Sequence, residues 1–174
     1  MSKEILKEEL LKALGDKRHD KQFMQQLDYE LSRFKSLGDD ASVVEATLLG
    51  YIIGSAKLTQ LLGALEQSDM ILLHRPGNTK SSPLCIDCED GNGFVALFTS
   101  IDKAIEATEH DKNYSRPGQL SMRDALEILI VDLQIPNLGL WVNPYDELMT
   151  FKFTPKQAKE FARIVLEKPP PLPS

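Results

Sequence analysis

Residues 84–100 read LCIDCEDGNGFVALFTS, and this stretch contains three patterns that could do chemistry. Cys85 and Cys88 form a C-x-x-C pair, a pattern that binds metal ions or carries out redox chemistry in other proteins. The acidic run around the second cysteine suggests a calcium loop. The spacing G-x-G-x-x-A, which starts at Gly91, suggests a loop that binds a nucleotide phosphate. Each pattern requires a particular local structure, and that requirement decides among them.

The cysteine pair does not have the surroundings of a metal or redox site. Residues 84–88 are expected to form a strand, in which side chains an odd number of positions apart point to opposite faces. A structural zinc site usually needs four ligands, and the sequence has no second C-x-x-C and no H-x₃₋₅-H. A redox C-x-x-C pair lies at the start of a helix, whereas a turn and another strand are expected here. We therefore expect the cysteines to pack, with no metal bound.

The calcium and nucleotide patterns fail on spacing and context. A calcium loop needs oxygen ligands at positions 1, 3 and 5, glycine at 6 and Glu at 12. A loop that starts at Asp87 has Gly91 at position 5 and Asn92 at position 6, and one that starts at Asp90 has Phe94 at position 5. A dinucleotide loop must open a helix, but the β-rich segment FVALFTS follows. We expect a strand, a turn and a central strand, and no cofactor.

No familiar catalytic set is present either. The three histidines are scattered, no G-x-S-x-G occurs, and adjacent carboxylates lie in expected turns. An enzyme with an unrecognised site would have it near the ends of the central strands, where the sequence places His74, Thr99, Asn143 and Tyr145. A structural role is favoured for these residues, because Asn143-Pro144 suits the start of a turn and Thr99 can cap a helix.

Composition restricts the class of protein and of partner. The chain has 174 residues, of which 42% are hydrophobic and 26% charged, as is usual for globular proteins. Its formal net charge of −6 argues against nucleic-acid binding and favours a basic protein partner. The N-terminus alternates charge with leucine, unlike a signal peptide, and no run reaches the ~18–20 apolar residues of a membrane span. We expect a cytoplasmic protein without a membrane or nucleic-acid partner.

The spacing of apolar residues predicts the helices and strands. Helices are expected at 3–14, 20–36, after Asp40, 58–67, 101–109, 123–133 and from Pro155 onward. Strands are expected at 70–74, 84–88, 94–99, 119–122, 138–142 and 147–153. Together they predict an α+β fold: a small mixed, largely antiparallel sheet with packed helices, and an added N-terminal helical region.

Details of this prediction can be compared with a structure. The segment 94–98 is apolar on both faces and should be a central strand. In the strand 147–153, Met149, Phe151 and Phe153 should share a buried face. In the last helix, Phe161, Ile164 and Val165 should be buried.

The chain is expected to have three parts. Residues 1–57 form an N-terminal helical extension, 58–167 an α/β domain, and 168–174 a Pro-rich tail. The apolar faces of the first helices need a partner, which is either their own domain or another copy in a homo-oligomer. The tail contains P-x-x-P beside a basic residue, the form that SH3-type domains bind, although a disordered end that stops the last helix is favoured.

The segment from about 58 to 166 resembles the N-terminal domain of the SseB family, the enhanced-serine-sensitivity proteins. The resemblance lies in LTQLLGALEQSDMILLHRP, GNGFVALFTSIDKAIEA, RDALEIL and LGLWVNPYDELMTFKFTPKQAKEF, in that order. It implies a small α/β domain without an established active site, found in bacterial proteins that act through protein contacts. The leading hypothesis is therefore a non-catalytic interaction or regulatory domain, of which a toxin-immunity protein would be one kind. The alternative is an enzyme with an unrecognised site.

Overall fold

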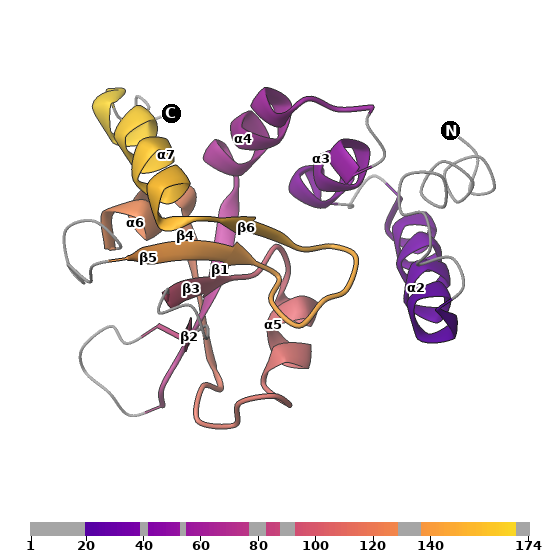
Figure 1. Cartoon of the computed structure of the whole chain (residues 1–174). Coiled ribbons are helices and arrows are strands. Elements are labelled where there is room, and N and C mark those ends of the chain that lie inside the picture. Colours follow the sequence, from indigo (N-terminus) through magenta and orange to yellow (C-terminus); the bar gives the residue numbers. More distant parts are fainter. Residues whose placement is uncertain are drawn as a thin grey trace. The chain divides into compact units, whose positions relative to one another are not determined.

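A computed structural model of the chain describes residues 20–38, 42–52, 55–76, 83–87, 93–128 and 137–169. Helices and a mixed, largely antiparallel sheet combine in an α+β fold, which confirms the predicted fold class (Figure 1). The chain divides into two compact units. One comprises Met1–Ala64 with Asp146–Thr150, and the other comprises Leu65–Tyr145 with Phe151–Ser174.

The first unit is helical in its described part. It contains α2 (Lys21–Leu37), α3 (Val43–Ile52) and most of α4 (Leu58–Glu66), all close to the predicted ranges. Its core consists of the buried residues Leu27, Leu31, Leu49, Leu148 and Met149. The last two come from the segment that joins two strands of the other unit, and this short piece of chain belongs to the first unit.

Helix α3 is capped by Ser42. The hydroxyl of Ser42 accepts a hydrogen bond from the Glu45 backbone N–H (3.3 Å), which satisfies a donor that the first helical turn leaves open. Asp40, after which this helix was expected, lies outside the described residues, as does the helix predicted at 3–14.

A buried ionic cluster joins α2 to α3. Both terminal nitrogens of Arg33 donate to the carboxylate of Glu45, and the first is also 3.6 Å from Glu30 Oε2. The side chains of both glutamates are fully buried. A guanidinium that binds a carboxylate through two nitrogens has a fixed geometry. The pair therefore fixes how α2 lies on α3.

The second unit contains the sheet strands. They are β1 (Asp69–His74), β2 (Cys85–Asp87), β3 (Gly93–Leu97), β4 (Arg116–Ser121), β5 (Leu138–Val142) and β6 (Phe151–Phe153). Strands β2-β3-β5-β6 form one sheet, in which only the β3–β5 pair is parallel, and β1 pairs antiparallel with β4. Strand β3 lies between β2 and β5, which confirms its predicted central place. Backbone hydrogen bonds of 2.9 and 2.8 Å between Ile71 and Phe98 connect β1 to the end of β3.

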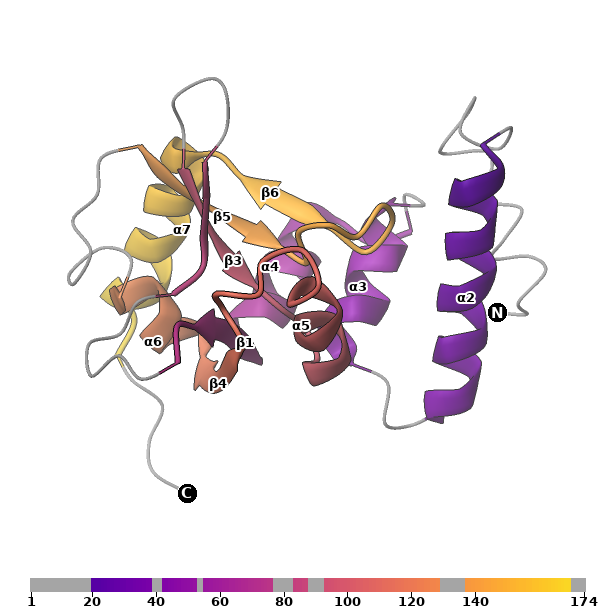
Figure 2. The ribbon, with the colours of Figure 1, turned by 90° about the horizontal axis from the view of Figure 1, so that it is seen from below.

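Helices cover both faces of this sheet (Figure 2). On one face, α5 (Ile101–Ala107) packs Ala104 and Ala107 against Ala96 and Phe98. On the other face, the ring of Phe153 stacks on Phe161 of α7 (Pro155–Glu167) at 5.3 Å between centroids. The short helix α6 (Met122–Glu127) contacts α7. Alternation of side chains along β3 supplies apolar groups to both layers.

Two details of the prediction are wrong. Residues 147–150 are not part of a strand, because the backbone N–H groups of Leu148 and Met149 both donate to Asp146 Oδ1 (2.9 Å each). A side chain that binds its own backbone in this way replaces strand pairing. In α7, Ile164 is 41% exposed, although Phe161 and Val165 are buried as expected.

The boundaries of two other elements also differ from the expected ones. Strand β4 begins at Arg116 rather than near 119. Helix α6 is described over 122–127 only, and the predicted continuation beyond 128 lies outside the described residues. Helix α7 begins as expected, with Pro155 in its first turn and a capping box between Thr154 and Gln157.

Candidate functional site

The polar site predicted at the strand ends forms where the parallel pair β3–β5 ends. Ligands of α/β sheets bind outside the carboxyl ends of parallel strands, so this position is the first to consider. Thr99 follows β3 and Asn143 follows β5. The Thr99 backbone N–H donates to Asn143 Oδ1 (3.0 Å), and Asn143 Nδ2 donates to Thr99 Oγ1 (2.9 Å). Asn143 is buried, and its own N–H donates to the Leu97 carbonyl (2.7 Å). These groups therefore join the two strand ends.

The backbone at this position has unusual torsion angles. Asn143 has a φ of 49° and Tyr145 a φ of 71°. Asn tolerates the left-handed region, but a bulky residue such as Tyr rarely adopts it. Backbone strain of this kind persists only where the surroundings hold it in place. Here the Asn143 hydrogen bonds hold one side, and the Tyr145 ring stacks on His110 at 4.2 Å, with 9° between the ring planes.

The environment of Tyr145 makes it a poor base. Partial burial raises the pKa of its phenol, and the negative charge of Asp111 raises that pKa further. The phenol therefore stays protonated at neutral pH. It can donate a hydrogen bond but does not supply a phenolate for proton abstraction.

His74 lies away from the other three predicted residues. The bridge between Ile71 and Phe98 is antiparallel, so β1 runs back along β3 and moves away from Thr99 as it approaches His74. His74 instead pairs with Arg116 of β4, and its ring packs over Gly118. Burial, and secondarily the charge of Arg116, lower the pKa of His74. The structure therefore brings together Thr99, Asn143 and Tyr145, but not His74.

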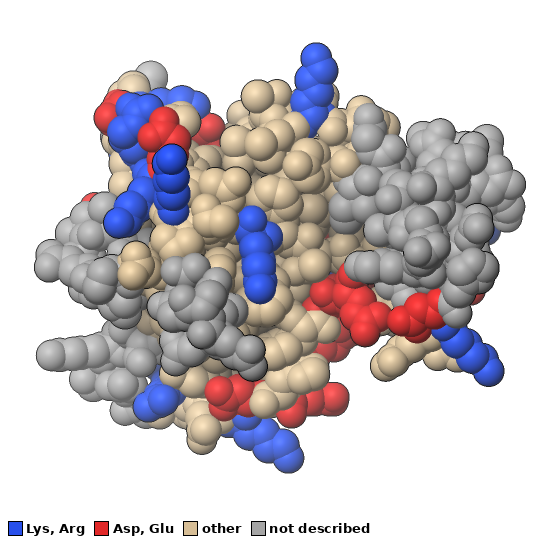
Figure 3. Space-filling view, viewed as in Figure 1, with Lys and Arg blue, Asp and Glu red and all other residues tan. Residues whose placement is uncertain are grey.

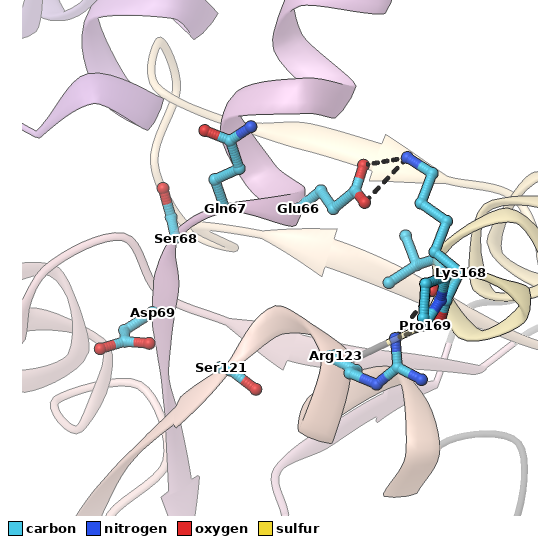
Figure 4. A pocket seen from close by; sticks show the side chains of 9 residues that line it. Glu66, Gln67, Ser68, Asp69, Ser121, Arg123, Lys168 and Pro169 are labelled. Atoms are coloured by element: carbon cyan, nitrogen blue, oxygen red, sulfur yellow. Dashed lines mark hydrogen bonds and ion pairs between the residues drawn. The ribbon is translucent and has the colours of Figure 1, made fainter. Parts of the chain in front are cut away.

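A separate cleft of about 430 Å³ lies at the C-terminal end of α7 (Figure 4). It is lined by Glu66, Gln67, Ser68, Asp69, Ser121, Arg123, Val165, Lys168 and Pro169. Its volume falls within the range of small-molecule sites. The sequence had not suggested it, because its walls come from three segments far apart in the chain.

The cationic groups of this cleft bind to the protein itself. Arg123 donates to the backbone carbonyls of Val165 (3.0 Å), Leu166 (3.3 Å) and Lys168 (3.0 Å), which the end of α7 leaves open. Lys168 Nζ donates to both oxygens of the Glu66 carboxylate at 2.9 Å, as the dashed lines of Figure 4 show. The arrangement anchors the end of α7 and does not single out a ligand.

The metal and nucleotide patterns of residues 84–100 are only partly described. Cys85 is half-buried, and Cys88 lies outside the described residues. Gly93 begins strand β3 rather than a helix. Over the described ranges, no group of three or more His, Cys, Asp or Glu side chains is placed to hold a metal ion. Within these ranges, too, no helix combines the length and apolar character that crossing a membrane requires.

Helix α5 has its large apolar residues on the outside. Its buried residues are Lys103, Ala104 and Ala107, whereas Ile101 is 45% and Ile105 57% exposed. The helix is capped by Ser100, whose hydroxyl accepts a hydrogen bond from the Lys103 backbone N–H (3.3 Å), and not by Thr99. The sequence shows that Ala and Ile are both apolar, but not which of them faces the sheet.

Comparisons with protein-family models, with curated proteins and with solved structures found no match to this chain.

Proposed function

We propose that this chain is a non-catalytic protein-interaction module that acts in the cytoplasm. One observation carries the proposal: α5 buries its alanines and leaves Ile101 and Ile105 in solvent. A surface helix normally turns its largest apolar side chains toward the core. Exposed apolar groups on a rigid element, rimmed by polar residues, are typical of protein-interaction surfaces.

The polar site supports the same proposal. Thr99 and Asn143 use their amide and hydroxyl groups on each other, so neither is poised toward a substrate. Tyr145 keeps its proton. The resemblance of 58–166 to SseB domains remains a prediction, and it points in the same direction.

One observation favours an enzyme instead. The positive φ angles of Asn143 and Tyr145 lie beside the carboxyl ends of parallel strands, where strained residues are often functional. A catalyst at this place would depend on His110 and the Tyr145 phenol as its proton-transfer groups. We rank this alternative second, because Thr99 and Asn143 bond to each other and the Tyr145 phenol keeps its proton.

Affinity capture from the native host tests the proposal. The full chain would be immobilised beside an unrelated acidic protein of similar size, and cross-linked captures would be quantified by mass spectrometry. We expect at least one protein that is retained by the full chain and absent from the control. Equal captures on both baits would contradict the proposal.

A further inference from the structure

We infer that the outer face of α5 binds a basic amphipathic helix of a partner protein, an inference that rests on the proposed function. The α-helix turns by about 100° per residue, so Ile101 and Ile105 form one stripe along α5. Asp102 and Glu106 form the adjacent stripe, and both are exposed. We call these four residues the α5 surface.

Acidic groups continue past the end of the helix. The Glu109 N–H donates to the Glu106 carbonyl (3.2 Å), so the chain keeps a helical course and leaves Glu109 exposed beside that acidic stripe. Figure 3 shows acidic side chains around α5 and the segment after it, with basic side chains at the edge of this region. Over α7 the same figure shows basic and acidic side chains mixed.

Two lysines lie near the α5 surface in the sequence. The Lys103 side chain is buried on the opposite side of α5, among the residues that face the sheet. Lys112 is exposed, but it follows the helix by five residues. The exposed acids Asp102 and Glu106 therefore border the apolar stripe of Ile101 and Ile105.

This pattern selects one class of partner. A second copy of the chain, packed symmetrically through α5, would place Asp102, Glu106 and Glu109 against like charges, which is unfavourable. Nucleic acid is repelled for the same reason. A helix with apolar residues spaced by four, flanked by Lys or Arg, would cover Ile101 and Ile105 and pair with the acids.

Two synthetic peptides test the inference. Both have Leu at helical spacing, and the positions that flank the leucines are Lys in one peptide and Glu in the other. Each would be titrated into the ¹⁵N-labelled full chain, with amide shifts recorded. We expect the Lys peptide to shift residues 101–109 selectively and to bind more weakly as salt increases. The Glu peptide should leave these residues unchanged. Shifts that are scattered, or absent from 101–109, would overturn the inference.

Matched variants test whether the peptide binds to the α5 surface or is attracted by the net negative charge of the whole chain. Ile105→Asp should weaken binding of the Lys peptide by about tenfold or more, because it places a charge in the apolar stripe. Ile164→Asp makes the same change on α7, where the isoleucine is 41% exposed, and should leave binding within about twofold. The double variant Asp102→Asn, Glu106→Gln should reduce the salt dependence of Lys-peptide binding. The control Glu160→Gln, on α7, should leave that salt dependence unchanged. Equal losses in Ile105→Asp and Ile164→Asp would overturn the assignment to α5.

The same baits distinguish failure of the surface from failure of the proposed function. If a host protein is captured by the wild type and equally by Ile105→Asp, the module function stands and the α5 inference is wrong. If no host protein is captured by any bait, the proposed function itself is wrong. Capture that is lost only in Ile105→Asp, together with selective shifts in α5, supports both.

Discussion

Asn143 and Thr99 join the carboxyl ends of the two parallel strands through a reciprocal pair of hydrogen bonds, 3.0 and 2.9 Å long. The two residues are 44 positions apart in the sequence. The Asn143 side chain amide bonds to both the backbone N–H and the hydroxyl of Thr99. It therefore fixes the end of β3, and with it the start of α5. The relationship ties the central sheet to the helix on which the proposed surface lies.

Replacing Asn143 should destabilise the fold in two separable ways. Asn143→Ala removes the bonds to Thr99 and places a Cβ-bearing residue without a polar side chain at a φ of 49°. We expect a loss of about 2–4 kcal/mol in the free energy of unfolding. Asn143→Gly loses the bonds but tolerates the positive φ, so its loss should be about 1 kcal/mol smaller. Urea denaturation of both variants measures this difference, and equal losses would contradict the role assigned to the backbone angle.

Gly139 in β5 should not accept a side chain. A Cβ there would meet the Phe153 carbonyl oxygen and would lie 2.8 Å from Phe94 Cε1. Gly139→Ala should therefore lower the melting temperature and cost about 1–3 kcal/mol. Gly63 in α4 is the matched control, because a Cβ there meets nothing within 4 Å. Gly63→Ala should raise stability by about 0.5–1 kcal/mol. A Gly139→Ala variant as stable as the wild type would show that β5 and β6 are not packed as described.

The buried cluster of α2 and α3 should depend on its cation. Arg33→Met leaves the carboxylates of Glu30 and Glu45 buried without the guanidinium, so we expect a loss of about 3–5 kcal/mol. Arg163→Met serves as the control, since Arg163 pairs with exposed carboxylates of Glu160 and Glu167 on the surface of α7. Exposed pairs contribute little. Thermal unfolding followed by circular dichroism would measure both. Similar losses in the two variants would contradict the burial of the cluster.

His74 should make stability depend on pH. Burial lowers the pKa of His74 below its ordinary value of 6.5, so the unfolded chain binds this proton more readily than the folded one. The contribution of His74 to the free energy of unfolding is therefore fully present above pH 6.5. It decreases as the pH falls from 6.5 through the lowered pKa of the folded state. His74→Gln should have a flatter profile across that window than the wild type. Parallel profiles for the two proteins, obtained by urea denaturation at each pH, would refute the shift.

Local signals in the sequence predicted much of the fold. Thr154-Pro155 predicted the start of α7, because the cap and the proline act on the nearest turn alone. The apolar run of β3 predicted a central strand. The segment 147–150 was mispredicted because alternating apolar residues indicate a strand, whereas the Asp146 carboxylate binds the Leu148 and Met149 N–H groups instead.

The candidate site was harder to predict, because it depends on pairing between distant segments. Thr99, Asn143 and Tyr145 meet since β3 and β5 are parallel neighbours, and no local pattern gives that pairing. His74 was grouped with them because it also ends a strand, but the direction of β1 carries it away. The exposure of Ile101 and Ile105 was not predicted. Helix periodicity places the alanines and the isoleucines of this segment on separate stripes, but it does not show which stripe faces the core.

The central claim is that this chain acts by binding a basic partner through the α5 surface. Quantitative capture from the host with wild-type, Ile105→Asp and Ile164→Asp baits tests it most directly. We expect a host protein that the wild type and Ile164→Asp retain equally, and whose retention by Ile105→Asp is about tenfold lower. Equal retention by all three baits, or no retained protein at all, would contradict it.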